Sequence, residues 1–158
     1  MDRLLIFMFW LFAFVALVFE PLYYFGCQWE AINCPNSPYL IVKFVGKIWE
    51  IYNQWDPLFN SIPLWLQLMC SIEVFIFGPL YAICAYGLQI KASWLPSVAL
   101  PFCGALFYST IVYFGMEFLD PLPGTNFVMV ILVNIPWSIF PVLLGMRVLQ
   151  KDFKVKTQ

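Results

Sequence analysis

The strongest constraint in this sequence is a set of four long apolar runs, at residues 4–25, 62–90, 94–119 and 127–149. Each run reaches the roughly 20 residues that a helix needs to cross the hydrocarbon core of a bilayer. Only 11% of the residues are charged and 63% are hydrophobic. A soluble domain of this length could not bury so much apolar surface. We therefore expect one domain over residues 1–158, folded as an all-α bundle of four transmembrane helices.

The positive charges predict the orientation of the bundle in the membrane. Six of them fall on the side of both termini: Arg3, Lys91, Arg147, Lys151, Lys154 and Lys156. Only Lys43 and Lys47 fall on the other side. Because cytoplasmic loops are rich in Lys and Arg, we expect cytosolic termini and a long loop, residues 26–61, that faces a lumen or the exterior.

The tail, residues 150–158, ends with Lys154 and Lys156 at the third and fifth places from the carboxyl end. Lysines at these places resemble the dilysine signal that returns membrane proteins to the endoplasmic reticulum. The alternative is that they are ordinary positive charges on the cytosolic side.

Residues 39–55 of the long loop have helical periodicity and two faces. The apolar positions are Ile41, Phe44, Val45, Ile48, Tyr52 and Trp55, whereas Lys43, Lys47, Glu50 and Gln54 lie on the other side. This pattern predicts a short amphipathic helix at the membrane interface. It either covers the bundle as a lid or serves only as a surface anchor.

Two of the five cysteines, Cys27 and Cys34, share the long loop and can pair if that loop is in an oxidising compartment. The spacing alone does not decide whether they do. The chain has no histidine and no Cys-x-x-Cys, so we expect neither a zinc site nor another cofactor. No basic patch suggests a nucleic-acid partner.

Three acids lie in or beside the apolar runs and are the first candidates for function. Glu20 is near the loop end of the first run, Asp56 precedes the second, and Glu73 lies about 11 residues inside it. Ionisable residues at such depth are costly and usually functional. We expect the three to converge and to receive a cationic amine or a hydroxyl group. The alternatives are that Glu20 reaches to the interface and Asp56 caps the second helix.

Further polar and aromatic groups lie in the middle of the third and fourth runs. Asn134 and Trp137 are three residues apart and share a helix face, and Tyr108, Ser109 and Thr110 offer hydroxyl groups. An aromatic wall beside a carboxylate suits an apolar cation. The alternative is that these residues only join helices by hydrogen bonds and packing.

Several short motifs, taken together, resemble one family. The chain reads Asp-Pro-Leu at 56–58, Pro-Leu-Trp at 63–65 and Cys-Ser-Ile-Glu-Val-Phe at 70–75, and Pro136 and Pro141 are five residues apart. This order resembles the EXPERA superfamily, which contains the emopamil-binding-protein sterol isomerases and the sigma-2 receptor, transmembrane protein 97. The resemblance extends over roughly residues 4–156 and is nearer to the sigma-2 receptor.

The resemblance implies a protein of the endoplasmic reticulum membrane whose pocket opens sideways to lipid and takes sterols and hydrophobic amines. In the family, an acid late in the first helix pairs with the ligand amine. That position holds Glu20 here, where the receptor has aspartate. Asp56 and Glu73 would support it. The resemblance also implies ligand contacts from Tyr108, Ser109, Asn134 and Trp137.

One departure from the family bears on catalysis. The isomerases have a histidine one turn before the deep glutamate, and this chain has Met69 there. Isomerisation needs one group to protonate a carbon and another to deprotonate its neighbour. We therefore expect a non-enzymatic sterol- and amine-binding protein with a role in cholesterol homeostasis and no catalytic residue. It can also bind a membrane-protein partner or a second copy of itself.

Two alternatives to ligand binding stay open. The first is a Δ8–Δ7 sterol isomerase that uses Glu73 as its acid and base, and the Asn-x-x-Trp spacing at Asn134 and Trp137 is more like that branch of the family. The second is a structural or partner-binding membrane protein whose polar groups only hold helices together.

Overall fold

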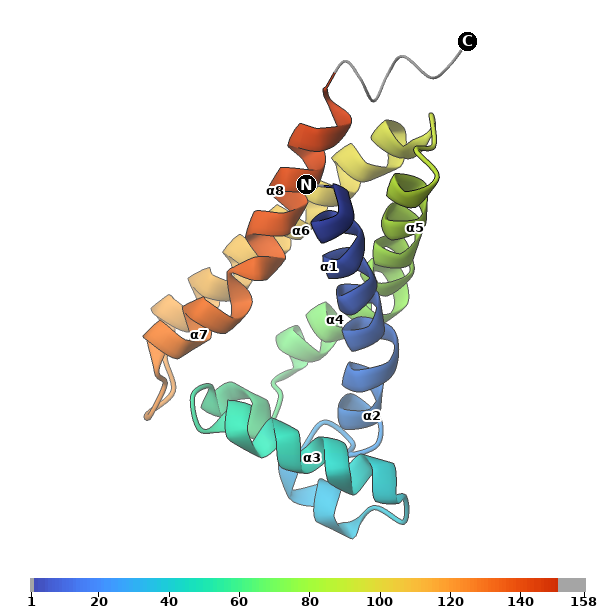
Figure 1. The fold of residues 1–158 in the computed structure, drawn as a ribbon. Helices are drawn as coiled ribbons and strands as arrows, with labels where there is room; N and C mark the ends of the chain where they lie inside the picture. Colours follow the sequence, from blue (N-terminus) through green and yellow to red (C-terminus); the bar gives the residue numbers. More distant parts are fainter. Residues whose placement is uncertain (1, 151–158) are drawn as a thin grey trace.

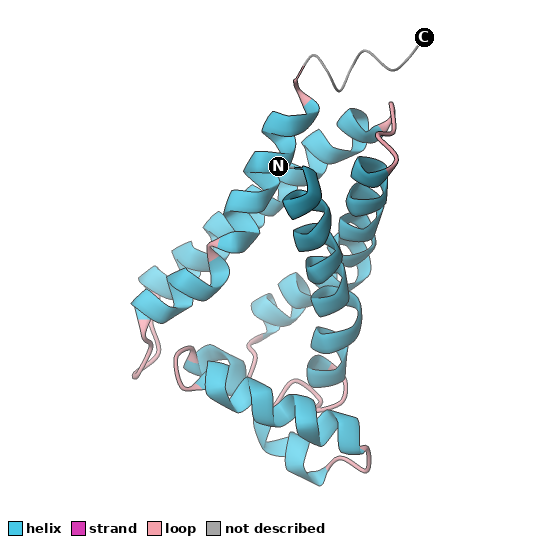
Figure 2. Cartoon of the chain, viewed as in Figure 1, coloured by secondary structure: helices cyan, strands magenta, loops and turns pink. Residues whose placement is uncertain are grey.

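The computed structural model describes residues 2–150. These residues form helices joined by loops, as Figure 1 and Figure 2 show. The four apolar runs become α1 (Asp2–Phe14), η1 (Val15–Phe19) and α2 (Glu20–Tyr24); α4 (Leu64–Ile72), η4 (Glu73–Phe77) and α5 (Gly78–Gln89); α6 (Leu95–Leu119); and α7 (Phe127–Asn134) and α8 (Pro136–Val148). Each set is long and apolar enough to cross a membrane. The expected all-α, four-helix membrane fold is confirmed for these residues. The predicted signal at Lys154 and Lys156 lies outside them.

Two of the four spans contain one turn of π-helix just before a proline. In η1 the backbone N–H of Glu20 donates to the carbonyl of Val15, and Pro21 follows. In η4 the N–H of Gly78 donates to the carbonyl of Glu73, and Pro79 follows. Proline has no N–H and its ring clashes with the preceding turn, so a wider turn here keeps the helix continuous. Such π-turns are frequent at functional sites, and η1 packs against η4.

The spans form two pairs that separate toward one end of the molecule. α1 packs along α5, and α6 packs along α8. Figure 1 shows α1 and α8 close together where α1 begins, and further apart toward α3 (Leu40–Asn53), which covers the opposite end. α3 thus lies across the separated ends of the spans.

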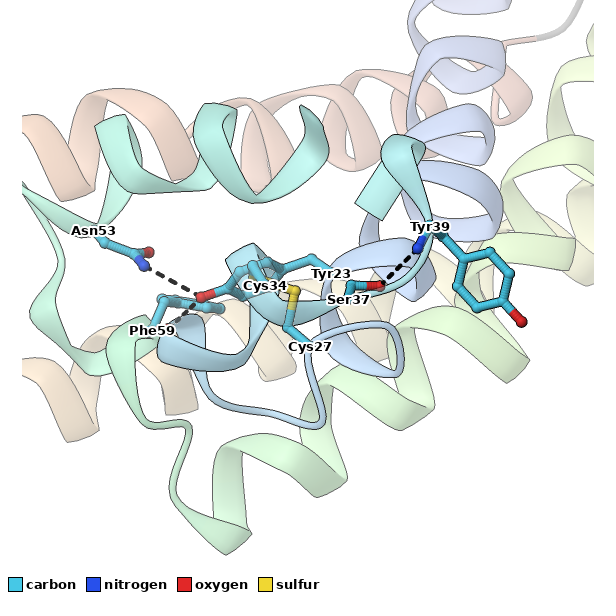
Figure 3. The surroundings of a disulfide bond; sticks show 7 residues. All are labelled: Tyr23, Cys27, Cys34, Ser37, Tyr39, Asn53 and Phe59. Atoms are coloured by element: carbon cyan, nitrogen blue, oxygen red, sulfur yellow. Dashed lines mark hydrogen bonds between the residues drawn. A yellow bond between two sulfur atoms is a disulfide. The ribbon is translucent and has the colours of Figure 1, made fainter. Parts of the chain in front are cut away.

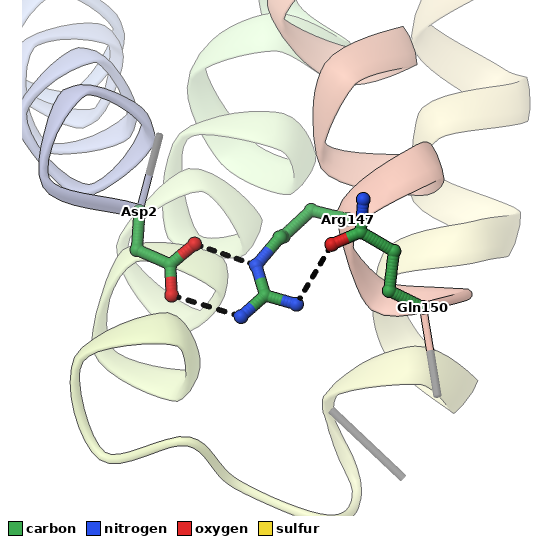
Figure 4. Close-up of polar contacts among 3 residues, drawn as sticks. All are labelled: Asp2, Arg147 and Gln150. Atoms are coloured by element: carbon green, nitrogen blue, oxygen red, sulfur yellow. Dashed lines mark hydrogen bonds and ion pairs between the residues drawn. The ribbon is translucent and has the colours of Figure 1, made fainter. Parts of the chain in front are cut away.

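An ion pair joins the first and last spans at the end where they are close. The guanidinium of Arg147 donates from Nε to Asp2 Oδ1 at 2.6 Å and from Nη2 to Asp2 Oδ2 at 3.0 Å, as Figure 4 shows. A third nitrogen of Arg147 donates to Gln150 Oε1 at 3.1 Å. A two-point contact of this kind fixes orientation as well as distance. It therefore holds the ends of α1 and α8 together.

The long loop is tied to α3 and to α2 by covalent and polar contacts. Cys27 and Cys34 form a disulfide, shown in Figure 3. The hydroxyl of Tyr23 donates to the carbonyl of Phe59 at 2.6 Å and accepts from Asn53 Nδ2 at 3.2 Å. These bonds connect α2, the end of α3 and the turn η3 (Pro57–Asn60), and the loop also contains the turn η2 (Ala31–Asn36). They hold α3 across the end of the bundle.

The expected helix over residues 39–55 is present as α3, and part of its predicted apolar face points outward. Ile41, Phe44 and Ile48 are exposed, whereas the buried side holds Val42, Val45, Gly46 and Asn53. A Cβ on Gly46 would lie 2.6 Å from Cys34 Cβ, so glycine allows α3 to pack closely on the disulfide. The sequence pattern missed this close contact. The helix thus covers the bundle with one side and presents an apolar stripe outward, as interfacial helices do.

The buried apolar side chains form two clusters, one at each end of the bundle. The cluster toward the chain ends includes Leu5, Phe9, Phe12, Tyr81, Leu88, Leu95, Phe102 and Leu144. The cluster toward α3 includes Tyr23, Tyr24, Val45, Phe59, Leu66, Cys70 and Tyr113. Both clusters contain several aromatic rings, and the space between them is the site described below.

The close approach of η1 and η4 requires Gly78, which gives the first prediction. A Cβ at Gly78 would lie 2.7 Å from Leu17 Cδ2 and 3.3 Å from Ala16 Cβ. Gly78→Val should therefore destabilise the detergent-solubilised protein by about 1–3 kcal/mol, as overpacking does. Thermal unfolding measures the change.

The matched control is Gly104→Val, because a Cβ at Gly104 meets nothing within 4 Å. It should leave the melting temperature close to that of the wild type. Equal melting temperatures for the two variants would contradict a tight contact between η1 and η4.

Candidate ligand-binding cavity

A cavity of about 290 Å³ lies between the two apolar clusters and is reached by every span and by α3. Its walls are mostly apolar and aromatic, with a few polar groups among them. The lining residues are Val15, Phe19, Glu20, Tyr24, Trp49, Tyr52, Phe59, Leu66, Met69, Cys70, Glu73, Tyr81, Leu106, Ser109, Thr110, Tyr113, Val133, Asn134 and Trp137. A concave, largely apolar space with a few polar groups is typical of a small-molecule site.

Glu20 and Glu73, two of the three predicted acids, both line this cavity. Glu20 directly follows η1, and Glu73 begins η4, so the contact of the two π-turns brings the acids to one space. Tyr81 donates its hydroxyl to Glu73 Oε1 at 2.8 Å. Glu20 Oε2 is buried and has no hydrogen-bond partner within residues 2–150. A buried acceptor without a partner is costly, so Glu20 is open to a donor from a ligand.

An indole donor in the same cavity also lacks a partner. The Nε1 of Trp49, on α3, is buried and bonds to no group in the described part of the chain. The Trp49 ring stacks on Tyr23 with 4.5 Å between centroids and on Phe59 with 5.2 Å. These contacts fix the indole, and the cavity therefore contains one unpartnered acceptor and one unpartnered donor.

Asn134 and Trp137 both face the cavity from the fourth span, as their spacing predicted. Asn134 Nδ2 donates to the Tyr52 hydroxyl and to the carbonyl of Val130, each at 2.9 Å. The Trp137 ring stacks on Phe12 with 4.1 Å between centroids. Both side chains are thus held by protein contacts and also line the cavity. They fit the structural interpretation and the ligand-binding interpretation equally.

Asp56 lies behind the cavity wall. It is fully buried and is not among the lining residues. It accepts hydrogen bonds from the hydroxyls of Tyr52, at 3.1 Å, and Tyr113, and from the backbone N–H of Leu58 at 3.1 Å. The acid therefore caps the short turn η3, and not the second span, which begins at Leu64. It also fixes two tyrosines that do line the cavity.

Burial controls the protonation of this polar cluster. It raises the pKa of the Asp56 carboxyl above its ordinary value, and the bonds from Tyr113, Tyr52 and Leu58 oppose that shift only in part. Burial also raises the pKa of the Tyr52 phenol, so its hydroxyl keeps its proton. The groups behind the cavity therefore favour neutral, hydrogen-bonded forms.

A comparison with protein families supports this assignment of the fold. The model of the EXPERA family (EXPanded EBP superfamily) matches residues 44–148, which is more than half of the chain. The chain belongs to the EXPERA family. No curated protein and no solved structure matches it.

The residues predicted from the EXPERA resemblance divide into three groups in the structure. Five of them line the cavity: Glu20, Glu73, Ser109, Asn134 and Trp137. Asp56 supports the wall from behind. Tyr108 does not reach the cavity, because its side chain is 70% exposed on the outer side of α6. Neighbouring residues on a helix point about 100° apart. The rotation of α6 that turns Ser109 and Thr110 into the cavity therefore leaves Tyr108 outside it.

Seven aromatic residues of this EXPERA cavity were not predicted as site residues: Phe19, Tyr24, Trp49, Tyr52, Phe59, Tyr81 and Tyr113. Tyr113 is four residues before Glu117 on α6, so these two share a helix side, whereas Tyr52 is four residues before Asp56, which lies beyond the end of α3. In a chain that is 20% aromatic, however, such spacing usually reflects core packing. Among residues 2–150, no three His, Cys, Asp or Glu side chains gather as a metal site requires.

The raised pKa of Asp56 predicts how stability depends on pH. The folded chain binds this proton more tightly than the unfolded chain, so wild-type stability should fall as pH rises from 3.8 through the raised value. Asp56→Asn has no such proton, so the melting temperature of the wild type should fall relative to that of the variant as pH rises. Thermal unfolding between about pH 4 and pH 8 tests this.

The control is Asp120→Asn, at the exposed end of α6. Its melting temperature should follow the wild type at every pH. A constant difference between wild type and Asp56→Asn across this range would show that burial does not hold the proton on Asp56.

Proposed function

We propose that this EXPERA protein binds sterols and hydrophobic amines in its intramembrane cavity, without catalysing their conversion, and serves sterol homeostasis. The observation that carries the proposal is the cavity itself, in which two carboxyl groups and an unpartnered indole donor stand among aromatic rings. An apolar body fits the walls, and a polar head fits the acids.

The cavity favours a positively charged or hydroxylated head group for electrostatic reasons. Glu20 and Glu73 place two carboxyl groups in one apolar space, where two negative charges would repel each other strongly. An ammonium group relieves that repulsion and can donate to the free Glu20 Oε2. The rings of Trp49 and Trp137 line the same cavity and add an aromatic wall beside that cation. A sterol hydroxyl can use the same acceptor and the Trp49 donor.

The divergence of the first and last spans supports entry from the bilayer. α1 and α8 separate toward α3 in Figure 1, and the lining residues include Phe19 from the first span and Val133 from the fourth. In this proposal the cavity opens sideways between these spans. Sterols and hydrophobic amines concentrate in membranes, so a lateral entrance suits them.

The positive charges and the disulfide favour a location in the endoplasmic reticulum with both termini in the cytosol. The bond between Cys27 and Cys34 suits an oxidising lumen, and the positive-inside rule independently supports a lumenal loop. The lysines at 154 and 156 would then stand in the cytosol, where a dilysine signal acts.

Glu20→Gln tests the proposed amine contact. The variant keeps the size of the side chain but loses its charge, so affinity for a hydrophobic cationic amine should fall at least about tenfold. Affinity for an uncharged sterol should change much less. Radioligand binding to the purified protein in detergent measures both.

The control is Glu30→Gln, which alters an exposed acid of the long loop and should bind like the wild type. Wild-type amine affinity in Glu20→Gln would remove Glu20 from this role. Absence of saturable binding of both ligands to the wild type would remove the proposed function, and would favour a structural or partner-binding role.

A Δ8–Δ7 sterol isomerase is the alternative that the site itself suggests, because Glu20 and Glu73 could act as acid and base across one cavity. Met69, which also lines the cavity, stands one turn before Glu73 and cannot exchange protons. The chain should therefore fail to rescue a yeast strain that lacks sterol isomerase. Rescue that is lost in Glu73→Gln would establish the enzyme instead.

A further inference from the structure

A second, smaller cavity lies at the loop side of the third span. Its volume is about 210 Å³, and its lining residues are Leu58, Ser61, Pro63, Trp65, Met116, Glu117, Asp120 and Leu122. Ser61, Asp120 and Leu122 are exposed, so this cavity opens at the surface beyond the end of α6. It lies on the same end of the molecule as α3 and the disulfide loop.

Glu117 is the buried acid of this second cavity. It is only 3% exposed, and its Oε1 has no hydrogen-bond partner within the described residues. Glu117 lies one turn beyond Tyr113 on α6, and Tyr113 donates to Asp56, so the Glu117 and Asp56 carboxyls are neighbours. Two carboxyl groups can share a hydrogen bond only when one of them holds a proton. The pair therefore holds a proton between the two carboxyls, and Glu117 is the member of the pair that lines the second cavity.

Asp56 links this pair to the ligand-binding cavity. The hydroxyls of Tyr52 and Tyr113 both donate to Asp56 Oδ2, and they lie 3.2 Å from each other. Both tyrosines line the larger cavity. Hydrogen bonds thus connect Asp56 to the wall of the larger cavity on one side, and Glu117 is its neighbour on the other.

We propose that Glu117, Asp56 and the tyrosine pair conduct protons between the second cavity and the ligand-binding cavity. A proton from the larger cavity binds a tyrosine oxygen, and the O–H bond of that tyrosine breaks as its own proton passes to Asp56. Asp56 passes a proton to Glu117, and Glu117 passes one to water in the second cavity. At each step one O–H bond forms as another breaks, so no oxidant or reductant is needed.

The surroundings of the chain favour this role over cation binding. The titratable groups that face it are Asp120 at the rim of the second cavity and Glu20, Tyr24, Cys70, Glu73 and Tyr81 in the larger one. Three ligating side chains that could hold a metal ion do not gather anywhere in residues 2–150. The groups present at both ends, by contrast, are able to give and accept protons.

Proton conduction gives the proposed ligand-binding function a further property, and this consequence rests on that function. A cationic amine that enters beside Glu20 and Glu73 adds a positive charge to an apolar space. Release of a proton through Asp56 and Glu117 would balance that charge. An uncharged sterol needs no such release.

Infrared spectroscopy tests the proton path without any ligand. The purified protein is moved from H₂O to D₂O at about pH 4, where carboxyl groups hold protons, and the C=O stretch of buried carboxyls is followed. Glu20→Gln and Glu73→Gln assign the band of the larger cavity. Deuterium should enter this band at least about tenfold more slowly in Glu117→Gln than in wild type. Glu117→Asp, which keeps an acid, should recover part of the rate.

The control for Glu117→Gln is Asp120→Asn, which changes an exposed acid of the same cavity and should exchange like the wild type. If Glu117→Gln fails to fold, as judged by circular dichroism and gel filtration, the double variant Tyr52→Phe with Tyr113→Phe replaces it. Tyr108→Phe, outside the cavity on α6, is then the control. Exchange at the wild-type rate in a folded Glu117→Gln, or in the double variant, overturns the proposal.

Mixing with a hydrophobic amine separates this proposal from the ligand-binding function. Tryptophan fluorescence reports binding, and a pH indicator in weak buffer reports the released proton. Slowed deuterium exchange in Glu117→Gln without amine binding by the wild type would leave the path standing and remove the function. Amine binding by the wild type, with exchange unchanged in Glu117→Gln, would remove the proton path and leave the ligand-binding function standing.

Discussion

The contact between η1 and η4 is the feature on which the cavity depends. Each π-turn precedes a proline, and each holds or adjoins a carboxylate. Gly78 lets the two turns approach closely, so Glu20 and Glu73 line the same cavity. In lipid, polar groups must find their partners inside the protein. This contact therefore directs both acids inward and separates the two apolar clusters, between which the cavity forms.

Hydropathy and depth along the helices predicted the four spans and the meeting of Glu20 with Glu73. They could not predict how far each helix is rotated about its axis. For this reason Ser109 lies in the cavity while Tyr108 does not, and the buried side of α3 follows Gly46 instead of Ile41 and Phe44. Glu117 ends an apolar run, and nothing in that run predicts that its side chain is buried beside Asp56. Such features depend on contacts between segments that are distant in the sequence.

The family match and the structure support different parts of the site. The match begins at residue 44, so it includes Asp56, Glu73, Asn134 and Trp137 but not Glu20 or η1. The position of Glu20 rests on the packing of the first span alone. That packing gives Glu20 an oxygen with no protein partner, whereas Glu73 is already bonded to Tyr81. The two acids are therefore not equivalent, and the less constrained one stands nearer the loop end.

The ion pair between Asp2 and Arg147 limits how the bundle can change shape. It fastens the outer ends of the first and fourth spans, and the disulfide loop and α3 brace the opposite end. Any widening must then occur in between, by bending where Pro21 and Pro136 interrupt the regular helix. The spans would then bend at mid-depth and admit a flat, elongated ligand there, while both ends of the bundle stay in place.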